Sequence, residues 1–112
     1  IVIGRDGAVL ETAVGNLWLR LDGAWVTPAL DGRVLPGIAR SRLLALALRT
    51  GLPVAERACD LGDLHRAEAL AHSNAVYGPR AAVLVSAGGA GAGSVAIVDS
   101  ELGSLWRSAP AR

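Results

Sequence analysis

The sequence of 112 residues predicts a single mixed α+β domain in which short strands form hairpins and a few helices cover them. Two tight-turn sequences, Arg5-Asp6-Gly7 and Asp22-Gly23, each separate apolar or β-branched runs, which is the pattern of hairpins. One longer run, Ile38–Thr50, has the apolar spacing of an amphipathic helix.

The first half of the chain is expected to contain two hairpins in series. Residues 1–3 and 8–13 flank the first turn, and residues 16–21 and 24–26 flank the second. Glu11 interrupts the strand expected over residues 8–13, and the residues on either side of Glu11 are apolar or β-branched. A carboxylate at this position either faces solvent or is buried with a partner, and the strand pattern allows both.

The helix predicted over Ile38–Thr50 has leucines on one side and arginines on the other. Gly51 and Pro53 follow the run and provide the expected helix end. We expect Leu44 and Leu48 to form the buried side, broadened by Leu43 and Leu46. Arg42 and Arg49 are expected on the solvent side.

The second half alternates short strands and helices. An edge strand is expected over residues 54–58, and Asp60 is a suitable N-cap for a short helix reaching residues 67–69. A strand then ends in a polar loop that continues to Arg80. Three more elements are predicted after it: a strand over residues 81–85, a strand over residues 94–98 and a terminal helix over residues 101–106.

Composition narrows the classes of function. Hydrophobic residues make up 52% and charged residues 19%, so we expect another domain or subunit to cover part of the surface. No apolar run is long enough to span a membrane, and a sequence that starts at Ile1 with no signal peptide reads as a fragment. A net charge of +1 and four aromatic residues exclude a nucleic-acid-binding surface.

Reactive side chains are few. All eleven basic residues are arginine, so any Schiff-base chemistry needs an amine from elsewhere. Cys59 is alone, which fits a reducing, cytoplasmic location. His65 and His72 lie on different predicted elements, so no metal site is expected. The glycine-rich run at residues 88–93 lacks the spacing of a nucleotide-binding loop and is expected to be a flexible hairpin loop.

The segment from Val26 to Arg40 offers an anion site. Pro36-Gly37 forms a turn immediately before the predicted helix, whose first N–H groups have no intrahelical partner. These groups and the positive end of the helix dipole favour phosphate, and Gly37 allows an oxygen to approach closely. An ordinary strand-to-helix loop has the same sequence features, so both readings stay open.

Four motifs occur together in one order: Glu11 with Asn16, Thr27-Pro28, the run Leu35-Pro36-Gly37-Ile38-Ala39-Arg40, and Ser73-Asn74-Ala75. Over residues 7–85 this order resembles the C-terminal half of fold-type IV pyridoxal-phosphate (PLP) enzymes, the class IV aminotransferase family. The resemblance implies the D-amino acid aminotransferase-like fold. It also implies that residues 1–112 form the large, cofactor-binding C-terminal domain of a homodimeric two-domain enzyme whose N-terminal domain is absent.

The resemblance also assigns site residues. Glu11 would face the pyridine nitrogen, with Asn16 a structural partner beside it, and Leu35 would pack on the ring. The phosphate would be held by Gly37, the N–H groups of Ile38 and Ala39, and the Asn74-Ala75 turn. Arg80 would bind a substrate carboxylate, unless it forms a structural ion pair. No catalytic residue is expected in this chain, because the family's Schiff-base lysine lies upstream of Glu11.

Within the family, the run from Leu30 to Arg40 and the Asn74-Ala75 pair most resemble 4-amino-4-deoxychorismate lyases, which release pyruvate and p-aminobenzoate in folate biosynthesis. Ala39 stands where the family's aminotransferases usually carry threonine. The small-molecule substrate is therefore expected to be 4-amino-4-deoxychorismate. Two alternatives remain: a class IV aminotransferase acting on branched-chain or D-amino acids, and a non-catalytic assembly module.

Overall fold

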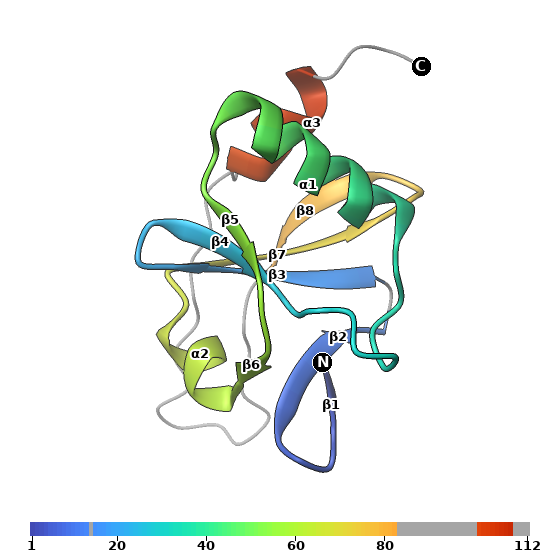
Figure 1. The fold of residues 1–112 in the computed structure, drawn as a ribbon, viewed down its shortest axis with the longest axis vertical. Helices are drawn as coiled ribbons and strands as arrows, with labels where there is room; N and C mark the ends of the chain where they lie inside the picture. The colour runs from blue at the N-terminus through green and yellow to red at the C-terminus, as the bar shows by residue number, and fades with distance from the viewer. Residues whose placement is uncertain (14, 83–100, 109–112) are drawn as a thin grey trace.

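The computed structural model describes residues 1–13, 15–82 and 101–108, and these form one mixed sheet with three helices around it (Figure 1). The helices are α1 (Ile38–Thr50), α2 (Leu61–Arg66) and α3 (Glu101–Ser108). The strands are β1 (Val2–Ile3), β2 (Ala8–Thr12), β3 (Gly15–Leu21), β4 (Ala24–Thr27), β5 (Val54–Glu56), β6 (Cys59–Asp60), β7 (Ala69–Asn74) and β8 (Gly78–Ala82). The predicted mixed fold with strands in hairpins is confirmed.

Both predicted hairpins of the first half form. β1 pairs antiparallel with β2, and β3 pairs antiparallel with β4. In the second turn Asp22 and Gly23 have φ angles of 49° and 80°, as a type I′ turn requires. Local turn chemistry therefore sets the register of the second hairpin.

β3 is the centre of the sheet, because three strands pair with it. β2 pairs at its first residues, β4 pairs at its last residues, and β7 pairs along residues 16–20. β5 lies at one edge and runs parallel to β4, so α1 is the crossover between these two strands. The edge strand expected after α1 is confirmed, but it ends at Glu56 rather than at residue 58.

Alternation along β3 divides the core into two clusters. Leu17, Leu19 and Leu21 pack on the side of α2, together with Val9 and Leu64. The other side carries Trp18 and Trp25, which pack against α1 and α3 through a second set of residues: Leu43, Leu46, Ala47, Leu102 and Leu105. Figure 1 shows α1 and α3 together at one end of the molecule and α2 at the other.

The bounds predicted for α1 are confirmed, but its predicted buried face is wrong in part. Leu48 is 85% exposed and Leu44 only half-buried, whereas Leu43, Leu46 and Ala47 are buried. Each residue turns the helix by about 100°, and the contact with α3 selects the stripe through Leu43 and Ala47. Arg49 is exposed as expected, while Arg42 is half-buried and lies 4.7 Å from the centre of the Trp106 ring.

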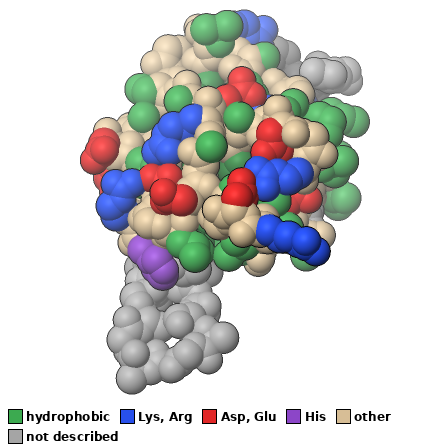
Figure 2. Space-filling view, turned by 60° about the horizontal axis from the view of Figure 1, so that its bottom comes forward, with side chains coloured by type: hydrophobic (Ala, Val, Ile, Leu, Met, Phe, Trp, Pro, Cys, Tyr) green, Lys and Arg blue, Asp and Glu red, His purple; other side chains and the backbone are tan. Residues whose placement is uncertain are grey.

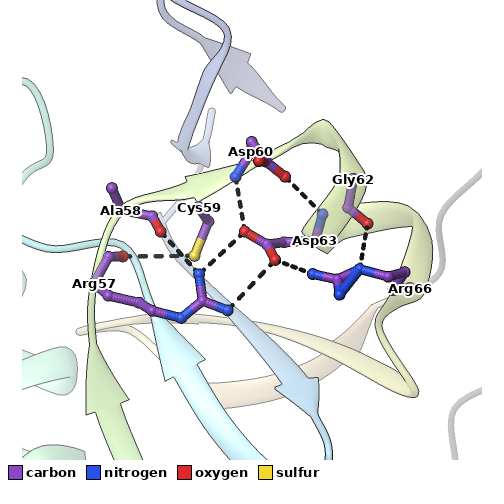
Figure 3. Close-up of polar contacts among 7 residues, drawn as sticks. All are labelled: Arg57, Ala58, Cys59, Asp60, Gly62, Asp63 and Arg66. Atoms are coloured by element: carbon purple, nitrogen blue, oxygen red, sulfur yellow. Dashed lines mark hydrogen bonds and ion pairs between the residues drawn. The ribbon is translucent and has the colours of Figure 1, made fainter.

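α2 begins at the predicted N-cap. The Asp60 carboxylate accepts a hydrogen bond from the Asp63 N–H at 2.8 Å, and the Asp63 carboxylate accepts one from the Asp60 N–H at 3.0 Å (Figure 3). Arg57 and Arg66 also bind Asp63, and these contacts hold the pKa of its carboxyl well below its ordinary value of 3.8. The helix ends at Arg66, earlier than expected, because the chain enters β7 at Ala69.

The final elements differ from the prediction in their bounds. β8 begins at Gly78 rather than residue 81, and Pro79 is tolerated because β8 pairs only with β7 among the described strands. α3 extends two residues beyond the predicted end, to Ser108. The predicted strand over residues 94–98 and the glycine-rich loop at residues 88–93 lie outside the described residues.

The surface mixes both signs of charge. On the face drawn in Figure 2, arginine and carboxylate side chains lie side by side between apolar ones. Among the described residues, no helix combines the length and apolar character that a membrane span requires.

Candidate functional site

A cleft of about 400 Å³ lies at the N-terminal end of α1, a size within the usual range of small-molecule sites. It is bounded by the end of β2, the start of β3, the loop before α1 and the turn after β7. The lining residues are Glu11, Thr12, Ala13, Gly15, Asn16, Leu35, Pro36, Gly37, Ile38, Ser73, Asn74 and Ala75.

Two polar side chains of the cleft hold the loop before α1. Glu11 and Asn16 are paired in register on β2 and β3, so their side chains lie on the same face of the sheet. The Glu11 carboxylate accepts a hydrogen bond from the Leu35 N–H at 2.8 Å, and Asn16 Nδ2 donates one to the Leu35 carbonyl at 2.7 Å. The Leu35 side chain is left 66% exposed at the cleft.

The start of α1 has the features of an anion site. Gly37 is the N-cap with extended backbone and makes no side-chain cap hydrogen bond. The first N–H groups of the helix have no intrahelical partner, and Ile38 is 71% exposed at this point. A Cβ added to Gly37 would overlap Asn16 Oδ1. The oxygen that approaches Gly37 closely in this structure is therefore the side-chain oxygen of Asn16.

The opposite wall is the end of β7. Gly15 lies so close to the Ser73 carbonyl that a Cβ on Gly15 would overlap it. Ser73 is fully buried, and its Oγ accepts a hydrogen bond from Trp18 Nε1 at 2.9 Å. Asn74 Oδ1 accepts hydrogen bonds from the N–H groups of Val76 and Tyr77, which shapes the turn that carries Ala75.

Six of the seven residues predicted to bind the cofactor line this cleft, although they come from three separate parts of the sequence: Glu11, Leu35, Gly37, Ile38, Asn74 and Ala75. The seventh, Ala39, is buried in the first turn of α1, where only its backbone N–H is suited to a ligand. Asn16 lies opposite Glu11, as expected of a structural partner.

Arg80 lies outside the lining of the cleft. Its guanidinium carbon stands 3.7 Å from the centre of the Tyr77 ring, a cation–π contact. Tyr77 in turn contacts His72 Nδ1 through its hydroxyl at 3.3 Å. The expected contact of Arg80 with a substrate carboxylate therefore stays a prediction.

Five lining residues were not assigned a role from the sequence, although Pro36 and Ser73 belong to the motifs that carry the resemblance: Thr12, Ala13, Gly15, Pro36 and Ser73. Gly15 and Ser73 lie together because β3 pairs closely with β7. A single sequence does not reveal this pairing, so it gave no signal that the two residues meet at the cleft. Thr12 faces Gly15 across the turn and donates a hydrogen bond to its carbonyl at 3.0 Å.

Reactive side chains also occur outside this cleft among the described residues. No group of three or more His, Cys, Asp or Glu side chains in the described ranges is arranged to hold a metal ion. Burial raises the pKa of the Cys59 thiol to about 11, so it stays protonated at neutral pH. Burial also lowers the pKa of His72 below 6.5.

The family of amino-transferase class IV matches residues 1–85 of the sequence. The chain belongs to this family. The match contains the whole cleft and all of the residues that line it.

Three relatives illustrate the range within the class IV family. A probable branched-chain-amino-acid aminotransferase of Thermotoga maritima is 35% identical over 77 residues, which cover 67% of this chain and 28% of the relative. The structure of 4-amino-4-deoxychorismate lyase from Pseudomonas aeruginosa superposes with a TM-score of 0.68 at 30% identity, covering 72% of this chain and 30% of that chain. An aminotransferase from Brucella abortus bound to the cofactor PLP gives a TM-score of 0.68 at 28% identity, covering 71% and 29%.

These relatives are several times longer than the part that matches. The chain spans less than a third of the length of each of the three. Solved structures of a putative branched-chain amino acid aminotransferase and of a 4-amino-4-deoxychorismate lyase share its fold, so the fold alone does not choose the reaction.

Proposed function

We propose that residues 1–112 form the C-terminal, cofactor-binding part of a PLP-dependent lyase that converts 4-amino-4-deoxychorismate to p-aminobenzoate and pyruvate. The observation that carries the proposal is the cleft itself. It brings Glu11, Leu35 and the start of α1 together around a space of about 400 Å³. A relative of the same family, the aminotransferase from Brucella abortus, binds PLP.

The residues present fit the phosphate end of PLP. The start of α1 offers N–H groups without intrahelical partners, and the positive end of the helix dipole lies there. Gly37 and the Asn74-Ala75 turn border the same region of the cleft. In the proposed complex the N–H groups of Ile38 and Ala39 would donate hydrogen bonds to the phosphate oxygens.

The residues present also fit the ring. Bound PLP supplies an electron sink for the bonds broken at the substrate carbon. Glu11, half-buried and held by the Leu35 N–H, is suited to accept a hydrogen bond from a protonated pyridine nitrogen. A carboxylate at that position keeps the nitrogen protonated. Leu35 would cover a ring face and exclude water from it.

The remaining parts of the site are proposed to come from the rest of the enzyme. The chain contains no lysine, so the amine that condenses with PLP is expected in the N-terminal domain of the same polypeptide. We propose a cytoplasmic homodimer in which the N-terminal domain and the neighbouring subunit complete the substrate pocket.

Ala39 favours the lyase over the transaminase within this proposal. The family's aminotransferases usually place a threonine hydroxyl where Ala39 offers only its N–H, so one contact to the phosphate is absent here.

The second candidate, an aminotransferase of branched-chain or D-amino acids, is supported by the 35% identity to the Thermotoga relative. A non-catalytic assembly module is the third candidate, and the chain's lack of lysine is compatible with it.

The test compares two reactions of the complete enzyme under matched conditions. Release of p-aminobenzoate from 4-amino-4-deoxychorismate is followed by fluorescence, and transamination is followed by glutamate formation from 2-oxoglutarate with branched-chain or D-amino acids. The lyase reaction is expected to be faster by a wide margin. Faster glutamate formation would instead establish the aminotransferase, and the absence of both reactions together with no PLP binding would favour the module.

A further inference from the structure

Arg40 is a buried arginine in the first turn of α1, with 2% of its surface exposed. Arginine is almost never buried to this degree unless it is paired. Its Nη2 donates to Glu56 Oε1 at 2.6 Å and to the Pro28 carbonyl at 3.1 Å. Glu56 belongs to β5 and Pro28 follows β4, so one guanidinium joins three segments that are separate in the sequence.

These contacts close the loop that leads to the cleft. The loop leaves β4 at Pro28 and enters α1 at Ile38. Arg40 holds its beginning, while Glu11 and Asn16 hold Leu35 near its end. Because the loop is held from both sides, the direction of the first N–H groups of α1 depends on the contacts of Arg40.

The position of Arg40 is unfavourable for the helix considered alone. The N-terminal end of a helix carries the positive end of its dipole, which disfavours a cation there, and α1 has no acidic residue in its first turn. Arg40 Nε is buried without a hydrogen-bond partner among the described residues. The pairing carboxylate of Glu56 remains 47% exposed, so solvent screens part of its charge. A bound dianion would offset this excess of positive charge.

Arg40 does not line the cleft but is close in the helix to a residue that does. Gly37 lines the cleft, and a Cβ placed on it would lie 3.8 Å from the Arg40 Cβ. The guanidinium, in contrast, is directed to Pro28 and Glu56, which do not line the cleft. Any effect of Arg40 on a ligand therefore acts through the helix start and through its charge, without contact.

We infer that Arg40, held in place by Glu56, is a positioning residue for phosphate recognition at the start of α1. The inference rests on the proposed function, in which the phosphate of PLP occupies that end of the cleft. It makes a specific statement: the Arg40–Glu56 pair contributes to the affinity for the phosphate group and contributes little to the affinity for the pyridine ring.

The test measures binding of PLP and of pyridoxal, which lacks the phosphate, to the complete enzyme by absorbance titration. Arg40→Met and Glu56→Gln are expected to weaken PLP binding by about tenfold or more, about 1.4 kcal/mol, and pyridoxal binding by less than about threefold. Methionine fills similar space and introduces no amine. Arg49→Met, the same substitution at the exposed far end of α1, is the control and is expected to leave both affinities unchanged.

Each outcome decides the inference. Equal weakening of PLP and pyridoxal binding would show a general structural role and overturn it, as would unchanged PLP binding. Should Arg40→Met fail to fold, Glu56→Gln decides, because Glu56 is half exposed on an edge strand and the amide keeps an oxygen for the buried Arg40 guanidinium while removing the charge. An unaltered enzyme that binds PLP no better than pyridoxal would contradict the proposed function itself, which separates the two failures.

Discussion

Glu11 and Asn16 face each other across β2 and β3, and together they bind both backbone polar groups of Leu35. Glu11 accepts a hydrogen bond from the Leu35 N–H at 2.8 Å, and Asn16 donates one to the Leu35 carbonyl at 2.7 Å. The backbone of Leu35 is therefore held on the sheet while its apolar side chain stays exposed at the cleft. This arrangement places a carboxylate, an apolar cover and the start of α1 next to one another.

The first prediction concerns the charge of Glu11. Glu11→Gln keeps an oxygen for the Leu35 N–H but removes the carboxylate expected at the pyridine nitrogen, so PLP binding should stay within a few-fold. Turnover of the complete enzyme should fall by roughly a hundredfold, a typical loss for one strong electrostatic contact. Steady-state kinetics and a PLP titration measure the two effects.

Glu101→Gln is the matched control for Glu11. Glu101 is a half-exposed carboxylate that pairs with Arg20 at 2.8 Å and does not line the cleft. The control is expected to leave turnover unchanged. Turnover that is also unchanged in Glu11→Gln would reduce Glu11 to an anchor for Leu35.

The second prediction concerns the contact between Gly37 and Asn16. Gly37→Ala would place a methyl group on Asn16 Oδ1, so either the helix start or the Asn16 side chain must move. We expect PLP affinity to fall by about tenfold or more, a loss of about 1.4 kcal/mol. Binding titrations of the complete enzyme measure the loss.

A double-mutant cycle identifies the cause of that loss. In Asn16→Ala the obstructing oxygen is absent, although the hydrogen bond to Leu35 is lost as well. The double variant should therefore bind PLP about as well as Asn16→Ala alone. Additive losses would mean that the methyl group at residue 37 acts on the ligand directly and that Asn16 is not involved.

Local chemistry made much of the fold predictable. The turn at Asp22-Gly23 and the N-cap at Asp60 depend on residues that are neighbours in sequence, and the structure confirms both. The bounds of α1 follow in the same way from the Pro36-Gly37 turn and from Gly51, whose φ of 78° ends the helix. The lining positions of Glu11 and Ile38 came from motif order, because the spacing of four motifs carries information that no single motif does.

Long-range packing accounts for what the sequence did not reveal. The exposure of Leu48 depends on where α3 lies against α1, and α3 is more than fifty residues further along the chain. Burial of Arg40 depends on Glu56, which the pairing of β5 with β4 places beside it. Ser73 became part of the cleft through its register with Asn16, which the pairing of β3 and β7 decides.

The third prediction concerns the missing amine. The chain contains no lysine, so borohydride reduction of the complete enzyme with PLP should attach the pyridoxyl group to a lysine outside residues 1–112. Peptide mapping by mass spectrometry locates the modified residue, and a sample left unreduced is the control. A pyridoxyl group on any residue of this chain would show that the chemistry has been assigned to the wrong place.

The fourth prediction concerns the ion pairs of Asp63 at the start of α2. Its carboxylate is buried, binds Arg57 and Arg66, and accepts the Asp60 N–H at 3.0 Å. Asp63→Asn removes the charge and should lower the free energy of unfolding at pH 7 by about 1–2 kcal/mol, a value reduced because both arginines are largely exposed. Thermal and denaturant unfolding measure the difference.

The control is Asp31→Asn, which removes an exposed carboxylate that also pairs with an arginine, Arg33 at 2.6 Å, and should change stability little.

The pH dependence of the Asp63 effect follows from the direction of the pKa shift. Hydrogen bonds from Arg57 and Arg66 lower the folded-state pKa of Asp63 below 3.8, so its contribution is fully present above about pH 4. As the pH falls further, the unfolded chain binds a proton before the folded protein does, and the contribution is progressively lost. The stability gap between the unaltered protein and Asp63→Asn should therefore be widest near pH 7 and narrow below pH 4. A gap that stays constant from pH 7 to pH 3 would mean that the carboxylate stabilises α2 through shape and hydrogen bonding, with no contribution from its charge.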